Sequence, residues 1–179
     1  MKKLFTVAAV ALVFVLGSAG AHAQTKIGYI NVDVVVGYMP ETAKLDSILE
    51  KFQSDTLNPE YAALVQRYQF DDSLYRDSLK TPKAVREEIA KKLPGYIYQI
   101  QNWQAIANQA LEGKQNELLA PIYNKVYNAI RAIAKEKGYT HVFSRDAVIV
   151  GPDGDDLLPL VAQRLKITIP QNVGRPRTN

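Results

Sequence analysis

Apolar side chains recur at the three- and four-residue spacing of an α-helix from Glu41 to Lys137, almost without interruption. Segments that alternate like β-strands lie on both sides of this stretch. We therefore predict an α+β fold: a strand, a long antiparallel helical hairpin with coiled-coil-like arms, a β-hairpin and a short C-terminal helix. Arms on a small β-sheet body provide extended surfaces rather than a catalytic cleft. The layout favours a protein that holds other proteins.

Residues 1–23 have the features of a cleavable signal peptide. Lys2 and Lys3 precede an apolar run at 4–16, and Ala21-His22-Ala23 fits the small residues that signal peptidase requires. A membrane anchor is the alternative, but the run is shorter than the roughly 20 residues that span a bilayer. We expect the mature chain to begin at Gln24 and to reside in the periplasm.

Removal of the signal peptide lowers the net charge. The chain has 22 basic and 18 acidic residues, and loss of two lysines leaves 20 minus 18, or +2. This balance argues against nucleic acid as a partner. The chain has no cysteine, so neither a disulfide nor a lipid-modified cysteine anchors it. Thin helical arms bury little surface per residue, which favours oligomerisation.

The segment from Lys26 to Val32 alternates like a half-buried strand. Asp33 is predicted to cap a short helix over 34–38. Pro40 and Glu41 suit the first turn of the outgoing arm.

Two proline signals divide the hairpin. Asn58-Pro59 resembles a helix cap followed by proline, which predicts a break or kink near residues 54–58. Thr81-Pro82 is a second such signal and the predicted reversal point. Leu79 is placed on the apolar stripe of the outgoing arm just before it.

The return arm contains Pro94-Gly95, which should kink the helix and is the alternative reversal point. The arm is predicted to end at Lys137, with Gly138 as its C-cap. Two strands, 139–143 and 147–150, then form a predicted β-hairpin turned at 144–146.

Asp155 or Asp156 is expected to cap the final helix, whose apolar face includes Leu157 and Leu165. After Ile169 the proline, glycine and arginines indicate a loose tail. The predicted units are the signal peptide (1–23), the β body and oligomerisation unit (24–40 and 138–169), the arm (41–137) and a flexible tail (170–179).

Catalytic constellations are missing from the sequence. Beyond residue 23 the only histidine is His141, and cysteine is absent, so neither a zinc site nor a cysteine nucleophile has a basis. Asp153, Asp155 and Asp156 lack the spacing of a calcium loop and are better explained as caps. We expect no catalytic, metal or cofactor site and no enzymatic activity.

Four segments in order resemble the Skp/OmpH family of periplasmic chaperones. They are Ile27-Gly28-Tyr29-Ile30-Asn31, Met39-Pro40-Glu41, Glu117 to Ile122 continuing to Lys137-Gly138-Tyr139, and Asp155-Asp156-Leu157-Leu158.

The resemblance implies a homotrimer in which strands of three subunits build a β body and three helical hairpins surround a cavity for unfolded outer-membrane proteins. It implies an ATP-independent holdase that prevents aggregation and uses no cofactor. A non-catalytic structural adaptor of an envelope complex, whose arms bind one folded partner, is the alternative.

Two sets of arm residues are candidates for client binding. Tyr61, Tyr68 and Tyr75 recur every seven residues and share one side of the outgoing arm. They either face the cavity or pack against the return arm around Trp103. The second set, here named the tip cations, would attract acidic clients or make transient contact with an anionic membrane surface, unless it is merely a solvated end. The tip cations are Arg76, Lys80, Lys83, Arg86, Lys91 and Lys92.

Overall fold

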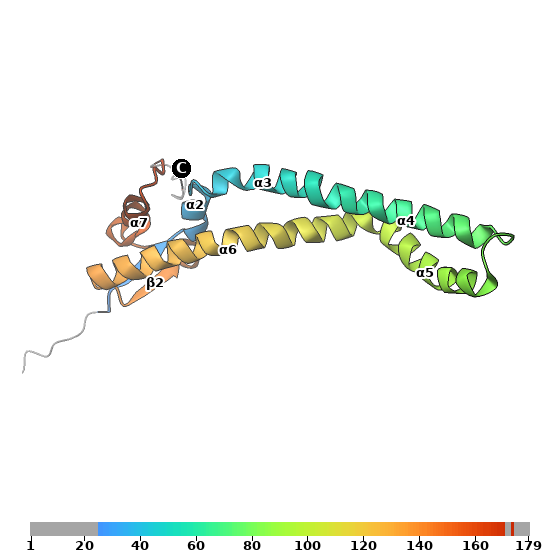
Figure 1. Cartoon of the computed structure of the whole chain (residues 1–179). Coiled ribbons are helices and arrows are strands. Elements are labelled where there is room, and N and C mark those ends of the chain that lie inside the picture. The colour runs from blue at the N-terminus through green and yellow to red at the C-terminus, as the bar shows by residue number, and fades with distance from the viewer. Residues whose placement is uncertain (1–24, 171–172, 174–179) are drawn as a thin grey trace, which may run out of the picture.

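The structure is a computed structural model that describes residues 25–170 and 173. The predicted signal peptide and nearly all of the predicted tail lie outside these residues. Figure 1 shows a small body at one end, from which a long helical hairpin projects as a single arm. The α+β architecture predicted from the sequence is confirmed in its main features.

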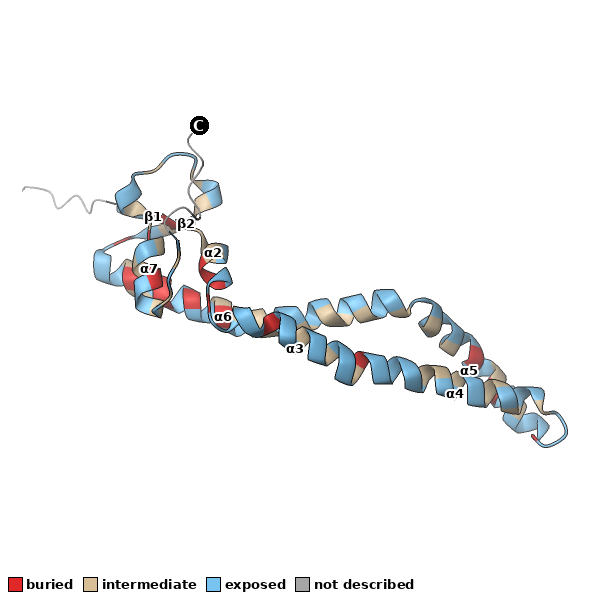
Figure 2. Cartoon of the chain, turned by 90° about the horizontal axis from the view of Figure 1, so that it is seen from above, coloured by how far each residue is buried: buried red, intermediate tan, exposed pale blue. Residues whose placement is uncertain are grey.

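The body is built around a two-stranded parallel sheet. Strand β1 (Ile27–Ile30) pairs with β2 (His141–Ser144) in the register Ile27↔His141 to Ile30↔Ser144. The strands pack with helices α2 (Val32–Gly37), α7 (Leu158–Leu165) and the end of α6 (Trp103–Lys137). The fully buried side chains at the centre are Ile30, Met39, Leu157, Val35, Val126 and Val161. Figure 2 shows that buried residues concentrate in this body and are sparse along the arm.

The cap of α2 differs from the prediction. Asn31 Oδ1 accepts a hydrogen bond from the Val34 backbone N–H at 3.0 Å, so Asn31 is the N-cap and the helix begins at Val32. Asp33 lies inside the first turn and instead accepts a hydrogen bond from the Tyr123 hydroxyl at 2.8 Å. Both residue types cap well, and the earlier one does so here because β1 ends immediately before it.

The predicted β-hairpin over 139–150 is wrong. Only the first segment is a strand, and it pairs with β1 in parallel. Residues Arg145–Ala147 form a 3₁₀ turn, η3. Val148 after it is extended, Ile149 and Val150 form a bend, and none of the three belongs to a strand; Ile149 is 96% exposed. The other edge of β1 pairs with the segment at Asp156 and Leu157: Leu157 donates its backbone N–H to the Tyr29 carbonyl at 2.9 Å.

The outgoing arm is one continuous helical path. It comprises η1 (Thr42–Lys44), α3 (Leu45–Phe52), the π-helical segment η2 (Gln53–Leu57) and α4 (Asn58–Arg76). Pro40 and Glu41 lie in the turn before η1 rather than in a helix.

The chain is not broken near Asn58, which has helical backbone angles and makes no capping bond. Pro59 lacks a backbone donor and crowds the preceding turn. The wider π turn just before Pro59 accommodates the proline ring and the missing donor. The helix therefore departs locally from α geometry but does not end.

The reversal at Thr81-Pro82 is confirmed. Helix α4 ends at Arg76, residues 77–82 connect, and α5 (Lys83–Gln101) starts after Pro82, whose backbone is extended. Pro94 lies inside α5, so Pro94-Gly95 is not the reversal point. The return path is interrupted instead at Asn102, whose side-chain amide donates to the Tyr98 carbonyl at 2.7 Å.

The predicted end of the return arm is confirmed. Helix α6 ends at Lys137, and Gly138 adopts the left-handed conformation with φ of 73°. At the final helix, Asp156 Oδ1 accepts from the Leu158 N–H at 2.9 Å. Asp155 has another role, since its carboxylate accepts from the Tyr139 hydroxyl at 3.2 Å. Among the described residues, no helix is long and apolar enough to cross a membrane.

Candidate binding surfaces of the arm

The first of the three heptad-spaced tyrosines packs across the hairpin. The rings of Tyr61 and Trp103 have centroids 5.4 Å apart and are tilted by 37°. Tyr61 still exposes 37% of its surface. Its aromatic contact therefore agrees with packing against the return arm, one of the two placements left open by the sequence.

The other two tyrosines differ from Tyr61 in exposure. Tyr68 is half-buried and Tyr75 is exposed, although the heptad spacing puts all three on one side of α4. Helix α4 packs along α5 over this region. The three tyrosines thus follow the interface between the helices, with Tyr68 the least exposed of them, rather than forming one free surface.

Several tip cations are already paired. Arg76 Nε lies 2.8 Å from Asp72 Oδ2, and Lys91 Nζ lies 2.6 Å from Glu88 Oε1. Lys83 Nζ is 3.8 Å from Glu87.

Lys80 and Lys92 have no ion-pair partner within the described part of the chain. The Nε of Arg86 is buried and lacks a hydrogen-bond partner there. The structure therefore spreads the predicted cation set over several environments, so it is not one uniform patch.

Three large apolar side chains of the distal arm are more open than the predicted tyrosines. Phe70 is 63% exposed, Tyr98 66% and Leu79 97%. Phe70 lies two residues, or about 200° of helix, beyond Tyr68, which turns it away from α5. Leu79 is in the connection rather than on the apolar stripe, contrary to the sequence prediction. The departure of Phe70 and Tyr98 from the three- and four-residue spacing was the signal that could have identified them.

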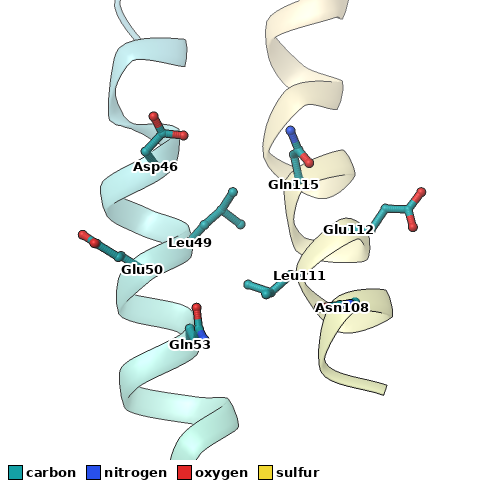
Figure 3. Close-up of a pocket in the computed structure, with 8 residues that line it drawn as sticks. All are labelled: Asp46, Leu49, Glu50, Gln53, Asn108, Leu111, Glu112 and Gln115. Carbon is teal, nitrogen blue, oxygen red and sulfur yellow. The ribbon is translucent and has the colours of Figure 1, made fainter. Parts of the chain in front are cut away.

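A groove of about 520 Å³ lies between α3 and α6, in the half of the arm near the body. Leu49 and Leu111 point toward one another across its floor (Figure 3). Asp46, Glu50 and Glu112 line it as exposed carboxylates. We name this feature the acidic groove.

Side-chain amides complete the acidic groove. Gln53, Asn108 and Gln115 line it together with the leucines and carboxylates. Each wall is a set with spacing i, i+3, i+4, i+7, which places its members on one side of a helix. The sets are Asp46, Leu49, Glu50 and Gln53 on α3, and Asn108, Leu111, Glu112 and Gln115 on α6.

Charge is segregated along the arm. Residues 50–115 contain nine acids and nine bases, yet six of the bases are the tip cations between 76 and 92. Three acids accompany them, which leaves a surplus of six minus three, or +3, near the tip. The total count hid this surplus, because outside 76–92 the same stretch contains six acids and three bases.

Polar contacts hold the arm to the body. Lys125 Nζ lies 2.7 Å from Glu41 Oε1, and its hydrogen bond lowers the pKa of that carboxyl. Arg164 lies 2.6 Å from Glu136 and likewise lowers the pKa of Glu136. The hydrogen bond to Asp33 raises the pKa of the Tyr123 hydroxyl.

Within residues 25–170 and 173, no group of three or more histidine or acidic side chains is arranged to hold a metal ion.

Comparisons with known proteins agree on one family. A family model described as outer membrane protein (OmpH-like) matches residues 26–165. The protein named chaperone protein Skp from Photorhabdus luminescens is 26% identical over 179 residues, covering 93% of this chain and all of that protein. The Skp of Vibrio cholerae is 25% identical over 174 residues, with the same coverage. Among solved structures, a Caulobacter crescentus chain described as OmpH-like shares the fold, with a TM-score of 0.50, 15% identity, and coverage of 79% of this chain and 84% of that one.

Proposed function

The chain belongs to the OmpH-like family, and from this premise we propose that it is a periplasmic, ATP-independent holdase that binds unfolded outer-membrane proteins and prevents their aggregation. Its matched relatives are named as chaperones. The proposal includes export by the segment 1–23, whose sequence has the charged, apolar and small-residue regions of a signal peptide.

One structural observation carries this proposal: the arm is long, thin and apolar on surfaces that no other described part of the chain covers. The 35 residues of α6 alone span about 50 Å. Phe70, Leu79 and Tyr98 project into solvent from the distal half of the arm. An unfolded client exposes apolar segments at many positions, so it is better shielded by scattered, shallow contacts than by one deep pocket.

We further propose that residues 24–40 and 138–169 act as the oligomerisation unit and that 41–137 act as the arm, with three copies surrounding the client. The outer edge of β2 has no partner strand among the described residues. Ile149 and Val150, which follow β2 and η3 in the chain, are almost fully exposed. Exposed edges and β-branched residues of this kind favour pairing with another chain.

The proposed client contacts combine the open apolar residues with the tyrosines and tip cations. Tyr75 and Lys80 are exposed near the arm tip, and Tyr68 would contribute from the edge of the helix interface. The cations would steer acidic segments, or a membrane surface, toward the arm at low ionic strength.

An aggregation assay tests the proposal. Several unrelated outer-membrane barrels are diluted from denaturant with and without the purified mature chain, and light scattering is followed. A holdase suppresses scattering of most of them without ATP. An adaptor for one folded partner suppresses none, and that result would reject the proposal.

The predicted assembly has a separate test. Analytical ultracentrifugation of the mature chain should give the mass of three copies. A compact monomer at micromolar concentration would contradict the shared-cavity arrangement, whatever the scattering result.

A further inference from the structure

We propose that the acidic groove binds a basic stretch of an extended, unfolded polypeptide, with a lysine or arginine side chain laid along its floor. The inference rests on the proposed function and adds a client chemistry to it. It also assigns a second binding place on the arm, on the half opposite to the tip cations.

The floor suits a long aliphatic stem. Leu49 and Leu111 are half-buried and approach one another from facing helices (Figure 3). Lysine and arginine lay their methylene groups on apolar surface while their charged ends remain in water. A volume of about 520 Å³ admits one or two such side chains.

The walls supply the opposite charge. Asp46, Glu50 and Glu112 have no ion-pair partner in the described part of the chain. By contrast, Lys114 of the same helix is paired with Glu117 at 3.0 Å and does not line the groove. In Figure 3 the side chains of Glu50 and Glu112 extend to the two outer sides of the groove rather than over the leucines. The charged end of a lysine or arginine whose stem lies on the floor therefore extends toward rim carboxylates that are not already neutralised.

The amides fit the backbone of an extended chain. Such a chain offers an unpaired N–H and C=O at every residue, and a side-chain amide both donates and accepts. Gln53 and Gln115 line the groove from its two walls. Asn108 Oδ1 accepts from Gln104 Nε2 at 3.0 Å, which orients the Asn108 amide nitrogen. Backbone bonding of this kind does not depend on client sequence, so selection for basic stretches comes from the carboxylates.

The two charge zones of the arm then have different tasks. The tip surplus of +3 favours acidic client segments, whereas the groove favours basic ones. An unfolded chain that carries both kinds of segment contacts the arm at two places, which raises its overall affinity beyond that of either contact.

The test uses two dye-labelled, unstructured peptides of equal length with a serine, glycine and leucine background. One carries lysines and the other glutamates at the same positions. Fluorescence anisotropy gives Kd for the full mature chain and for two double variants. The groove variant is Glu50→Gln with Glu112→Gln. The matched control is Asp55→Asn with Glu60→Gln, which makes the same charge change at exposed residues of the same arm outside the groove.

The groove variant should bind the lysine peptide about fivefold more weakly, as expected for loss of two exposed ion pairs. The control should change Kd less than twofold, and neither variant should weaken the glutamate peptide. An equal loss in both variants would overturn the proposal, since general arm charge would explain it. No loss in the groove variant would also overturn it. A change in oligomer mass in the groove variant, without loss of peptide affinity, would show that a second copy occupies the groove.

The scattering assay separates this inference from the proposed function. If the wild-type chain fails to protect any unfolded barrel, the proposed function fails regardless of peptide affinity. If the wild type protects and the groove variant keeps full affinity for the lysine peptide, only the groove assignment fails. Circular dichroism of each variant checks that the helical arm is intact.

Discussion

Tyr61 and Trp103 pack across the hairpin as a tilted aromatic pair with ring centroids 5.4 Å apart, and Trp103 is the first residue of α6 after the interruption at Asn102. The aromatic pair therefore ties the two arms together beside the point where the return helix is interrupted. Such a contact adds to stability beyond the apolar area that it buries.

Tyr61→Ala should lower the free energy of unfolding by about 1 kcal/mol through loss of the aromatic pair. Trp103 is the only tryptophan in the chain. Its fluorescence emission should shift to longer wavelength in this variant, because water replaces the Tyr61 ring beside it. Tyr98→Ala is the control, because removal of that exposed side chain should lower the free energy of unfolding by less than about 0.5 kcal/mol. Equal losses in urea titrations of the two variants would contradict the packing role.

Gly28→Ala should destabilise the body by about 1–3 kcal/mol. A methyl group at Gly28 would overlap Leu157 Cδ1 and lie 3.0 Å from the Tyr139 ring. Gly113→Ala provides the opposite case. No atom lies within 4 Å of the position that the added methyl group would take, and the residue is inside α6. That change should stabilise the chain by about 0.5–1 kcal/mol. Urea unfolding measures both, and a stabilising Gly28→Ala would refute the close packing.

Acid should weaken the attachment of arm to body. Lys125 and Arg164 lower the pKa of Glu41 and Glu136 in the folded state. A carboxyl with a lowered folded pKa contributes stability above its unfolded value, near 4.5, and that contribution is lost as pH falls through the folded pKa. The wild type should therefore lose stability below about pH 4.5.

The variant Glu41→Gln with Glu136→Gln should show a smaller difference between urea midpoints at pH 7 and pH 3.5. Glu60→Gln is the control, since Glu60 is exposed and has no ion-pair partner among the described residues. If the double variant and the control have the same pH response, the two ion pairs are not the cause.

Serine substitutions at Phe70, Leu79 and Tyr98 should reduce protection of unfolded barrels while each changes the free energy of unfolding by less than about 0.5 kcal/mol. The reason is that these side chains present apolar area without supporting the core. Several-fold more protein should be needed for half-maximal suppression of scattering. Tyr38→Ser, at an exposed aromatic residue of the body, should leave protection unchanged.

Local signals predicted the hairpin well. Thr81-Pro82 marked the reversal, because proline cannot continue the preceding helix but suits the start of the next. Gly138 marked the end of α6, because the left-handed conformation is inexpensive only for glycine. In each case the decisive interactions lie within a few residues along the chain.

Nonlocal choices were not predicted. The segment 147–150 has the composition of a strand, but β2 takes one edge of β1 and Leu157 the other, so the segment cannot pair with β1. The 3₁₀ turn η3 at 145–147 stands where a hairpin with β2 would need a tight turn, and the free edge of β2 stays unpaired among the described residues. Asn58 has the composition of a cap, yet the neighbouring π turn accommodates Pro59 and the helix continues. Both outcomes depend on competition between residues that are distant in sequence or on hydrogen bonding of the whole helix.

The sequence by itself determined the long helical arms, their reversal and their ends, because helix periodicity, proline and glycine act locally. Only the tertiary structure decided how the charges and aromatic rings are distributed. The antiparallel alignment brings Leu49 beside Leu111 and Tyr61 beside Trp103. That alignment depends on packing along the entire interface between the arms, so the acidic groove arises only when the hairpin closes, whereas the tip cations are already neighbours in the sequence.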